Sequence, residues 1–286
     1  MPLLKITKLP NYKMMSVVQF GTLDYATGLR LQQKLVALRK DGRIGDVLLL
    51  LEHTPVITFG RNATAANVLA SPELLQGRGV EIFKCDRGGD VTFHGPGQLV
   101  GYPIFDLRGF PAEDGRRKTL GVIEYVRRLE EVLIRTCADF RIPTERVPGL
   151  TGVWTSPPQE ASTSVASLSA PAREQAKIAA IGVHISRSVT SHGFALNVNT
   201  DLTYFDLIVP CGIANKPVTS IARELGHEIP MEGVAHSIAR NFGTVFQSQI
   251  LWIETLEALL GESVGVPVKP PSEFQQLHRE DDTFWA

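Results

Sequence analysis

Residues 87–100 read Arg-Gly-Gly-Asp-Val-Thr-Phe-His-Gly-Pro-Gly-Gln-Leu-Val, a stretch unlike the rest of the chain. The pair Gly88-Gly89 allows a backbone to approach a ligand closely, Arg87 and His94 flank it, and Thr92 adds a hydroxyl. The stretch is not a P-loop, because no Gly-Lys-Ser/Thr follows, and it lacks the G-x-G-x-x-G pattern of dinucleotide-binding turns. Its residues alone leave open a structural turn or a ligand-binding loop.

Helix and strand patterns alternate on the N-terminal side of this stretch. The spacing of Leu31, Leu35 and Leu38 predicts a helix over residues 25–40, with Asp24 as its cap and Gly42 after its end. Two short apolar runs bounded by turn residues then predict buried strands at 47–51 and 56–59.

A long amphipathic helix is predicted on the C-terminal side, over residues 120–140, with Thr119 as its cap. Cys137 lies on its apolar stripe, so it is interpreted as a small core residue. The stripe is formed by Val122, Val126, Leu129, Leu133 and Cys137.

Composition places the chain among ordinary globular proteins. Of 286 residues, 43% are hydrophobic and 21% charged, and the net charge of -1 provides no basic field for nucleic acid. No apolar run approaches the roughly 18 residues that cross a bilayer. Three scattered cysteines exclude a disulfide framework, and no H-E-x-x-H or C-x-x-C motif suggests a catalytic metal. These features favour a reducing compartment.

The second half of the chain is interrupted by a segment rich in small and polar residues. Ser, Thr, Ala and Pro fill 14 of the 21 positions in residues 156–176, a composition typical of a flexible insertion. Strands are predicted close to it on both sides, so we interpret it as an insertion inside one domain over residues 1–265, followed by a surface tail at 266–286. The further elements predicted here are strands at 152–155, 177–185 and 193–199 and a helix at 231–247.

Two residues are candidates for chemistry. Cys211 lies between Pro210 and Gly212, a setting that suits either an exposed nucleophile or a packed turn. Lys177 opens an apolar strand, where partial desolvation would favour a neutral general base, but the local residues alone favour an edge lysine with its ammonium in water. His192, before a small-residue strand, is most simply a solvated or satisfied side chain.

Several segments together resemble a known family, the lipoyl(octanoyl) transferases. The resemblance extends over roughly residues 15–245, because the early pair Leu49–His53 and Thr58–Arg61 also resembles the family. The segments that carry it, all in the order of the family, are Arg87–Val100, Gly152–Thr155, Lys177–Gly182, Ser191–Asn197 and Pro210–Gly212.

The resemblance implies an α+β fold, a mixed β-sheet flanked by helices, as in the catalytic domain of biotin and lipoate protein ligases. It implies transfer of an octanoyl group from the phosphopantetheine thioester of acyl carrier protein to a lysine of lipoyl domains, on E2 subunits and H protein. Cys211 would carry the acyl group and Lys177 would assist it, with no ATP, metal or other cofactor. The implied substrate pocket comprises Arg87, Gly88, Gly89, Asp90, Val91, Thr92, Phe93, His94, Ala180, Ile181, Gly182, His192, Gly193, Phe194 and Ala195.

The long segment at 156–176 departs from the short bacterial connection. This segment and the stretch Ile208–Gly212 favour a eukaryotic member in the mitochondrial matrix, with the cytoplasm as the alternative for a bacterial source. The nearest rival is an ATP-dependent lipoate or biotin ligase, which needs a lysine but no cysteine nucleophile. A module that binds lipoyl domains without chemistry and a thiol hydrolase are further alternatives.

Overall fold

A computed structural model describes residues 13–112, 119–156, 175–210 and 216–261. Its large sheet contains eight strands: β1 (Lys13–Leu23), β2 (Asp46–His53), β6 (Gln98–Ile104), β7 (Thr144–Val147), β8 (Leu150–Thr155), β9 (Lys177–Ser186), β10 (Val189–Asn197) and β11 (Ser248–Ile253). Their order is β11-β1-β2-β6-β10-β9-β8-β7. β1 pairs in parallel with β2 and β11, and the remaining pairs are antiparallel. The sheet is therefore mixed, as expected.

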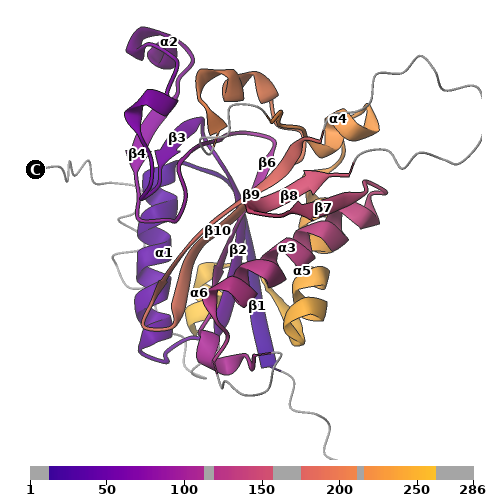
Figure 1. The fold of residues 1–286 in the computed structure, drawn as a ribbon. Coiled ribbons are helices and arrows are strands. Elements are labelled where there is room, and N and C mark those ends of the chain that lie inside the picture. Colours follow the sequence, from indigo (N-terminus) through magenta and orange to yellow (C-terminus); the bar gives the residue numbers. More distant parts are fainter. Residues whose placement is uncertain (1–12, 113–118, 157–174, 211–215, 262–286) are drawn as a thin grey trace, which may run out of the picture.

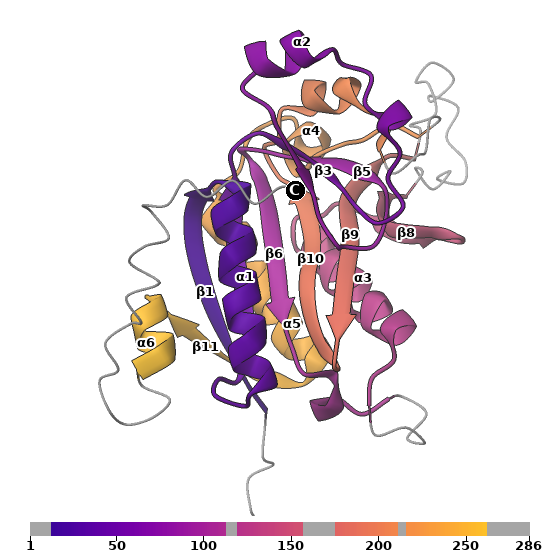
Figure 2. The ribbon, with the colours of Figure 1, turned by 90° about the vertical axis from the view of Figure 1, so that its left-hand side faces the viewer.

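Helices cover both faces of this sheet (Figures 1 and 2). Helix α1 (Tyr25–Lys40) lies on one face, and α3 (Val122–Asp139) and α5 (Met231–Phe246) lie together on the other. Strand β2 is buried on both sides: Leu48 and Leu50 join the core under α3 and α5, whereas Leu49 and Leu51 join the core under α1. A strand buried on both faces explains the continuous apolar run in the sequence.

A second, smaller sheet lies at one end of the large one. It consists of β3 (Val56–Phe59), β4 (Glu81–Lys84) and β5 (Val91–His94), in the order β4-β3-β5. A third apolar cluster joins it to short helices. The short helices of the structure are α2 (Pro72–Gly77), α4 (Ile221–Leu225), α6 (Leu256–Gly261) and the 3-10 turns η1 (Ala65–Asn67), η2 (Leu107–Gly109) and η3 (Leu202–Leu207).

Local signals placed α1 correctly at both ends. The Asp24 side chain accepts a hydrogen bond from the Thr27 N–H at 2.8 Å, and Gly42, with φ of 70°, follows the helix end. Leu31, Leu35 and Leu38 are buried. No helix among the described residues is both long and apolar enough to cross a membrane.

The start of α3 differs from the sequence prediction. Its cap is Gly121, not Thr119, and Val122 is 52% exposed while Tyr125 is fully buried. Leu120 causes the shift: its side chain is in the core and its N–H donates to the Leu107 carbonyl, which holds it outside the helix. The prediction of Cys137 as a core residue is confirmed, because it is completely buried.

The predicted insertion falls between β8 and β9, which are hydrogen-bonded neighbours. Residues 157–174 themselves, like the predicted tail at 266–286, lie outside the described residues. Strand β10 begins at Val189, four residues earlier than predicted, because a two-residue turn at Arg187 and Ser188 connects it tightly to β9. Both turn residues have positive φ, the geometry of a primed hairpin turn.

Candidate active site

A narrow cavity lies between the glycine-rich segment before β5 and strands β6, β9 and β10 of the large sheet. Its free volume, the space at its open mouth included, is about 480 Å³. Thirteen of the fifteen residues predicted to bind substrate line it, and their role as a substrate pocket stays a prediction. They are Arg87, Gly88, Gly89, Asp90, Thr92, His94, Ala180, Ile181, Gly182, His192, Gly193, Phe194 and Ala195.

The other two, Val91 and Phe93, do not line the cavity. They lie on β5, where successive side chains point to opposite faces. Thr92 and His94 therefore face the cavity, whereas Val91 and Phe93 join the apolar cluster under the small sheet. Alternation along a four-residue strand excludes these two from the predicted pocket.

Arg87 holds the glycine turn against β3. Its Nη2 donates to the Thr58 carbonyl at 2.7 Å and to the Thr58 hydroxyl at 2.9 Å, and its Nη1 donates to the Gly88 carbonyl at 3.1 Å. The residue is 7% exposed, and these acceptors are neutral oxygens. A Cβ at Gly60 would collide with the Gly89 carbonyl, so the approach of the two segments requires glycine there. The guanidinium thus anchors the loop and lines the cavity as a positive charge.

His94 faces the cavity as a neutral acceptor. Its Nδ1 lies 2.7 Å from the Gln98 amide oxygen, while the Gln98 amide nitrogen donates to Asn197 at 2.9 Å. Because an amide oxygen only accepts, His94 Nδ1 carries the hydrogen and Nε2 keeps its lone pair. Burial first, and then the electrostatic influence of His53 and Arg87, lowers the pKa of His94 to about 3.

His192 sits at a distorted point of β10. Its φ is 54°, its N–H donates to the Gln32 side-chain oxygen at 2.8 Å, and its Nε2 lies 2.7 Å from an Asp86 oxygen. The hydrogen bond to His192 lowers the pKa of Asp86 to about 2. At the next position, a Cβ on Gly193 would collide with the Gly101 carbonyl. The strand therefore needs glycine to keep the wall of the cavity close to β6.

Three further residues line the cavity that the sequence did not indicate: Tyr25, Val100 and Tyr102. The Tyr102 hydroxyl donates to His53 Nε2 at 2.6 Å, and His53 Nδ1 donates to the Leu23 carbonyl at 3.0 Å. One sequence signal could have indicated Tyr102: it is a tyrosine within an otherwise apolar, buried strand, and a buried hydroxyl needs a hydrogen-bond partner.

Lys177 is 8% exposed at the start of β9. Its N–H donates to the Pro217 carbonyl at 2.8 Å, and its Nζ lies 5.3 Å from the centre of the Trp154 ring. Gly152, with φ of 122°, makes room for it, since a Cβ there would be 2.8 Å from Lys177 Cε. The side chain is thus packed in the protein rather than extended into water.

Cys211, with Gly212 of the same motif, lies outside the described residues, so its pairing with Lys177 stays a prediction. Its chain neighbours are anchored on both sides of residues 211–215. The Val209 N–H donates to the Asn67 carbonyl at 2.8 Å, and the Thr219 N–H donates to the Lys177 carbonyl at 2.9 Å. Residues 217–219, which follow the undescribed positions, therefore run directly beside Lys177.

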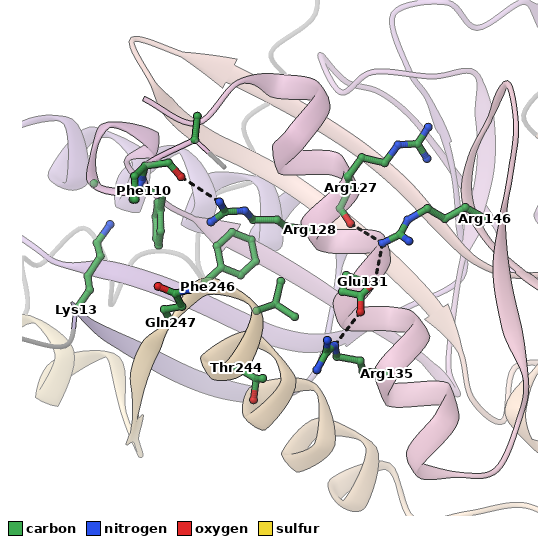
Figure 3. A pocket seen from close by; sticks show the side chains of 14 residues that line it. Lys13, Phe110, Arg127, Arg128, Glu131, Arg135, Arg146, Thr244, Phe246 and Gln247 are labelled. Atoms are coloured by element: carbon green, nitrogen blue, oxygen red, sulfur yellow. Dashed lines mark hydrogen bonds and ion pairs between the residues drawn. The ribbon is translucent and has the colours of Figure 1, made fainter. Parts of the chain in front are cut away.

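A second, larger groove lies on the other side of the molecule, beside α3 and α5 (Figure 3). It contains none of the predicted site residues. Its arginines are held by ion pairs: Arg146 and Arg135 contact Glu131 at 2.8 and 2.9 Å, and Arg128 contacts Glu124 at 3.0 Å. Paired arginines on a partly solvated surface bring little net charge to a ligand, so the glycine-lined cavity is the better candidate site.

Solved structures with a similar fold include lipoate protein ligases. The bipartite lipoate protein ligase of Thermoplasma acidophilum superposes with a TM-score of 0.63 at 13% identity, covering 87% of this chain and 89% of that one. Lipoate-protein ligase A bound with ATP gives a TM-score of 0.57 at 12% identity, covering 87% and 91%. The expected α+β fold of lipoate protein ligases is confirmed.

The model of the lipoyl protein ligase A/B catalytic domain matches residues 24–243, and this chain belongs to that family. Among its relatives is an octanoyltransferase of Koribacter versatilis, 58% identical over 268 residues, or 94% of this chain and 98% of the relative. An octanoyltransferase of Acidobacterium capsulatum is 59% identical over 250 residues, or 87% and 96%. The resemblance to lipoyl(octanoyl) transferases is therefore confirmed.

These relatives come from bacteria. They do not support the prediction of a eukaryotic member in the mitochondrial matrix, which relied on the length of the segment at 156–176 and on the stretch Ile208–Gly212. Surface insertions change length at small energetic cost, about 0.6 kcal/mol per doubling. Insertion length is consequently a weak indicator of source.

Proposed function

We propose that this protein transfers an octanoyl group from the phosphopantetheine thioester of acyl carrier protein to a lysine of lipoyl domains, those of E2 subunits and H protein. It is an acyltransferase, and relatives at 58% and 59% identity are octanoyltransferases. One structural observation carries the proposal: the glycine turn and the β9–β10 hairpin, which lie far apart in the sequence, enclose a single cavity. The bacterial relatives favour the cytoplasm as its location.

The proposed reaction has two steps through a thioester on Cys211. In the first, the Cys211 sulfur attacks the donor carbonyl, the carbon–sulfur bond to pantetheine breaks, and the pantetheine sulfur takes up the proton that Cys211 lost. In the second, the acceptor lysine attacks the new thioester, an amide forms, and the cysteine thiol is restored. A thioester is already activated, so the proposal involves neither ATP nor a metal ion.

Lys177 is proposed to hold and move the proton in both steps. An ammonium next to a thiol favours the thiolate, the reactive form. The anchored setting of Lys177, beside Trp154 and hydrogen-bonded to residues 217–219, supports this role. In the second step its neutral amine accepts the proton from the attacking lysine and returns it to the leaving sulfur.

The cavity is proposed to hold the acyl chain. Ala180, Ile181, Phe194 and Ala195 offer apolar surface, and each buried methylene contributes about 0.8 kcal/mol. Burial lowers the pKa of His94 to about 3, so its ring is neutral at neutral pH and adds no charge to this surface. The cavity therefore suits a saturated chain whose polar end stays at the mouth.

Intact-protein mass spectrometry after incubation with octanoyl-acyl carrier protein tests the proposal. The wild-type protein should gain one octanoyl group without ATP and lose it on addition of a lipoyl domain. Cys211→Ala should gain none, while Cys85→Ala and Cys137→Ala serve as matched controls and should gain it. Acylation that requires ATP and free octanoate would point instead to a ligase.

Variants of Lys177 separate its two roles. Lys177→Arg keeps the charge but cannot release a proton at accessible pH, so it should form some acyl-enzyme and lose the second step by about 10²–10⁴-fold. Lys177→Ala should be poor in both steps. Unchanged single-turnover rates in Lys177→Ala would exclude the proposed dyad.

A further inference from the structure

The cavity runs across the strands of the large sheet rather than along them. Its walls come from β9, β10 and β6 in turn, and the register joins Phe194 to Ile181 on one side and to Gly101 on the other. Neighbouring strands lie about 4.8 Å apart, so three strands span about 10 Å. An extended eight-carbon chain advances about 1.3 Å per bond, or about 9 Å in all. The width of three strands thus matches an octanoyl chain.

The two ends of the cavity differ. Lys177 lies on β9, and Gly152 of β8 packs against it, so the reactive end of a bound thioester belongs on the β9 side. The methyl end of the chain then points toward β6, where Val100 and Tyr102 line the wall. Whatever closes the β6 end limits the length of chain that fits.

Tyr25 closes that end. It is the first residue of α1, it lines the cavity, and it is 1% exposed. Its ring stacks on His94 with 6.3 Å between centres and contacts Phe83 at 5.4 Å and His53 at 5.2 Å. Contacts on several sides fix the orientation of the ring.

The structure behind Tyr25 leaves no space for a longer chain. His53 is fully buried and is hydrogen-bonded at both ring nitrogens, to Leu23 and Tyr102. A Cβ at Gly28 would be only 2.8 Å from the His53 ring, so α1 already lies as close to His53 as a helix backbone can. Admitting more carbons would require breaking these buried hydrogen bonds, which is costly.

We propose that Tyr25 is the residue that determines acyl-chain length, acting as the end wall against which the methyl group of an eight-carbon chain rests. This inference rests on the proposed function, since it takes the cavity as the acyl site. Tyr25 does not take part in bond making; it selects among donors. The preferred substrate is accordingly a saturated acyl group of about eight carbons, and the ring rather than the hydroxyl sets the limit.

The test measures kcat/KM for transfer from hexanoyl-, octanoyl-, decanoyl- and dodecanoyl-acyl carrier protein to one lipoyl domain. In an apolar slot each accommodated methylene is worth about fourfold. The wild-type protein should prefer octanoyl, and Tyr25→Ala should raise the ratio of decanoyl to octanoyl by about tenfold or more. Tyr25→Phe should keep the wild-type profile because the ring remains.

A matched control and two further variants keep the test decisive. Leu29→Ala, one turn along α1 and lining a different cavity, should leave the chain-length profile unchanged. Tyr25→Leu removes less volume and serves if Tyr25→Ala does not fold, whereas Tyr25→Trp should shift the preference toward hexanoyl. A folded Tyr25→Ala or Tyr25→Leu protein with the wild-type profile would overturn the inference. A wild-type protein that transfers no acyl group would instead refute the proposed function.

Discussion

Two buried histidines should make the folded protein sensitive to mild acid. Burial lowers the pKa of His53 to about 4 and that of His94 to about 3, and both side chains are neutral in the folded state. On unfolding each imidazole enters water, where its pKa is about 6.5. Below pH 6.5 the unfolded state therefore binds more protons than the folded state, and stability decreases as the pH falls toward 4.

The size of the effect follows from these pKa values. Between about pH 4 and pH 6.5, each histidine changes the free energy of unfolding by about 1.4 kcal/mol per pH unit. Each histidine therefore makes the free energy of unfolding about 2 kcal/mol lower at pH 5 than at pH 7.5. Together they should lower the free energy of unfolding by about 4 kcal/mol, a large fraction of a typical 5–15 kcal/mol. Carboxylates contribute little to this difference, because pH 5 is above their ordinary pKa values of about 4.

Urea unfolding followed by tryptophan fluorescence at pH 7.5 and pH 5 measures this difference. In His53→Gln the loss between the two pH values should fall from about 4 to about 2 kcal/mol, whatever the substitution does to stability at neutral pH. His227→Gln, at an exposed position, is the matched control and should lose as much as the wild-type protein. If His53→Gln lost the full amount, the buried neutral histidine would not be the cause.

Three further outcomes are expected. Deleting residues 159–174 should leave octanoyl transfer within a few-fold of wild type, because the flanking strands already pair and loop length costs little; a large loss of kcat in a folded protein would give the segment a role at the site. Gly193→Ala should destabilise the protein by about 1–3 kcal/mol and abolish transfer, because its Cβ would collide with the Gly101 carbonyl. Gly21→Ala, whose Cβ has open space, should change stability little. Equal urea-unfolding midpoints for the two variants would contradict this prediction. Cys137→Ala should lower stability by about 1–2 kcal/mol with transfer retained, as measured by thermal unfolding alongside the transfer assay, because Cys137 is a buried core residue.

The sequence by itself determined the elements whose ends are set locally. Helix α1 begins and ends where Asp24 and Gly42 predicted, because a cap and a left-handed glycine act within one turn of chain. The buried strand β2 was likewise evident from its apolar run. Thirteen of the fifteen residues predicted to form the pocket do line one cavity. The family resemblance, rather than the chemistry of neighbouring residues, identified them.

Tertiary structure decided the features that depend on contacts between distant segments. Leu120 is held in the core by Leu107, which moves the start of α3, and the hairpin turn at Arg187-Ser188 lacks the Gly or Asn that would have indicated it. The cavity is also lined by Tyr25 and Tyr102, which come from a helix and a strand far apart in the sequence. Their positions follow from strand register and from the packing of α1 on His53, and such packing is fixed only when the whole sheet has formed.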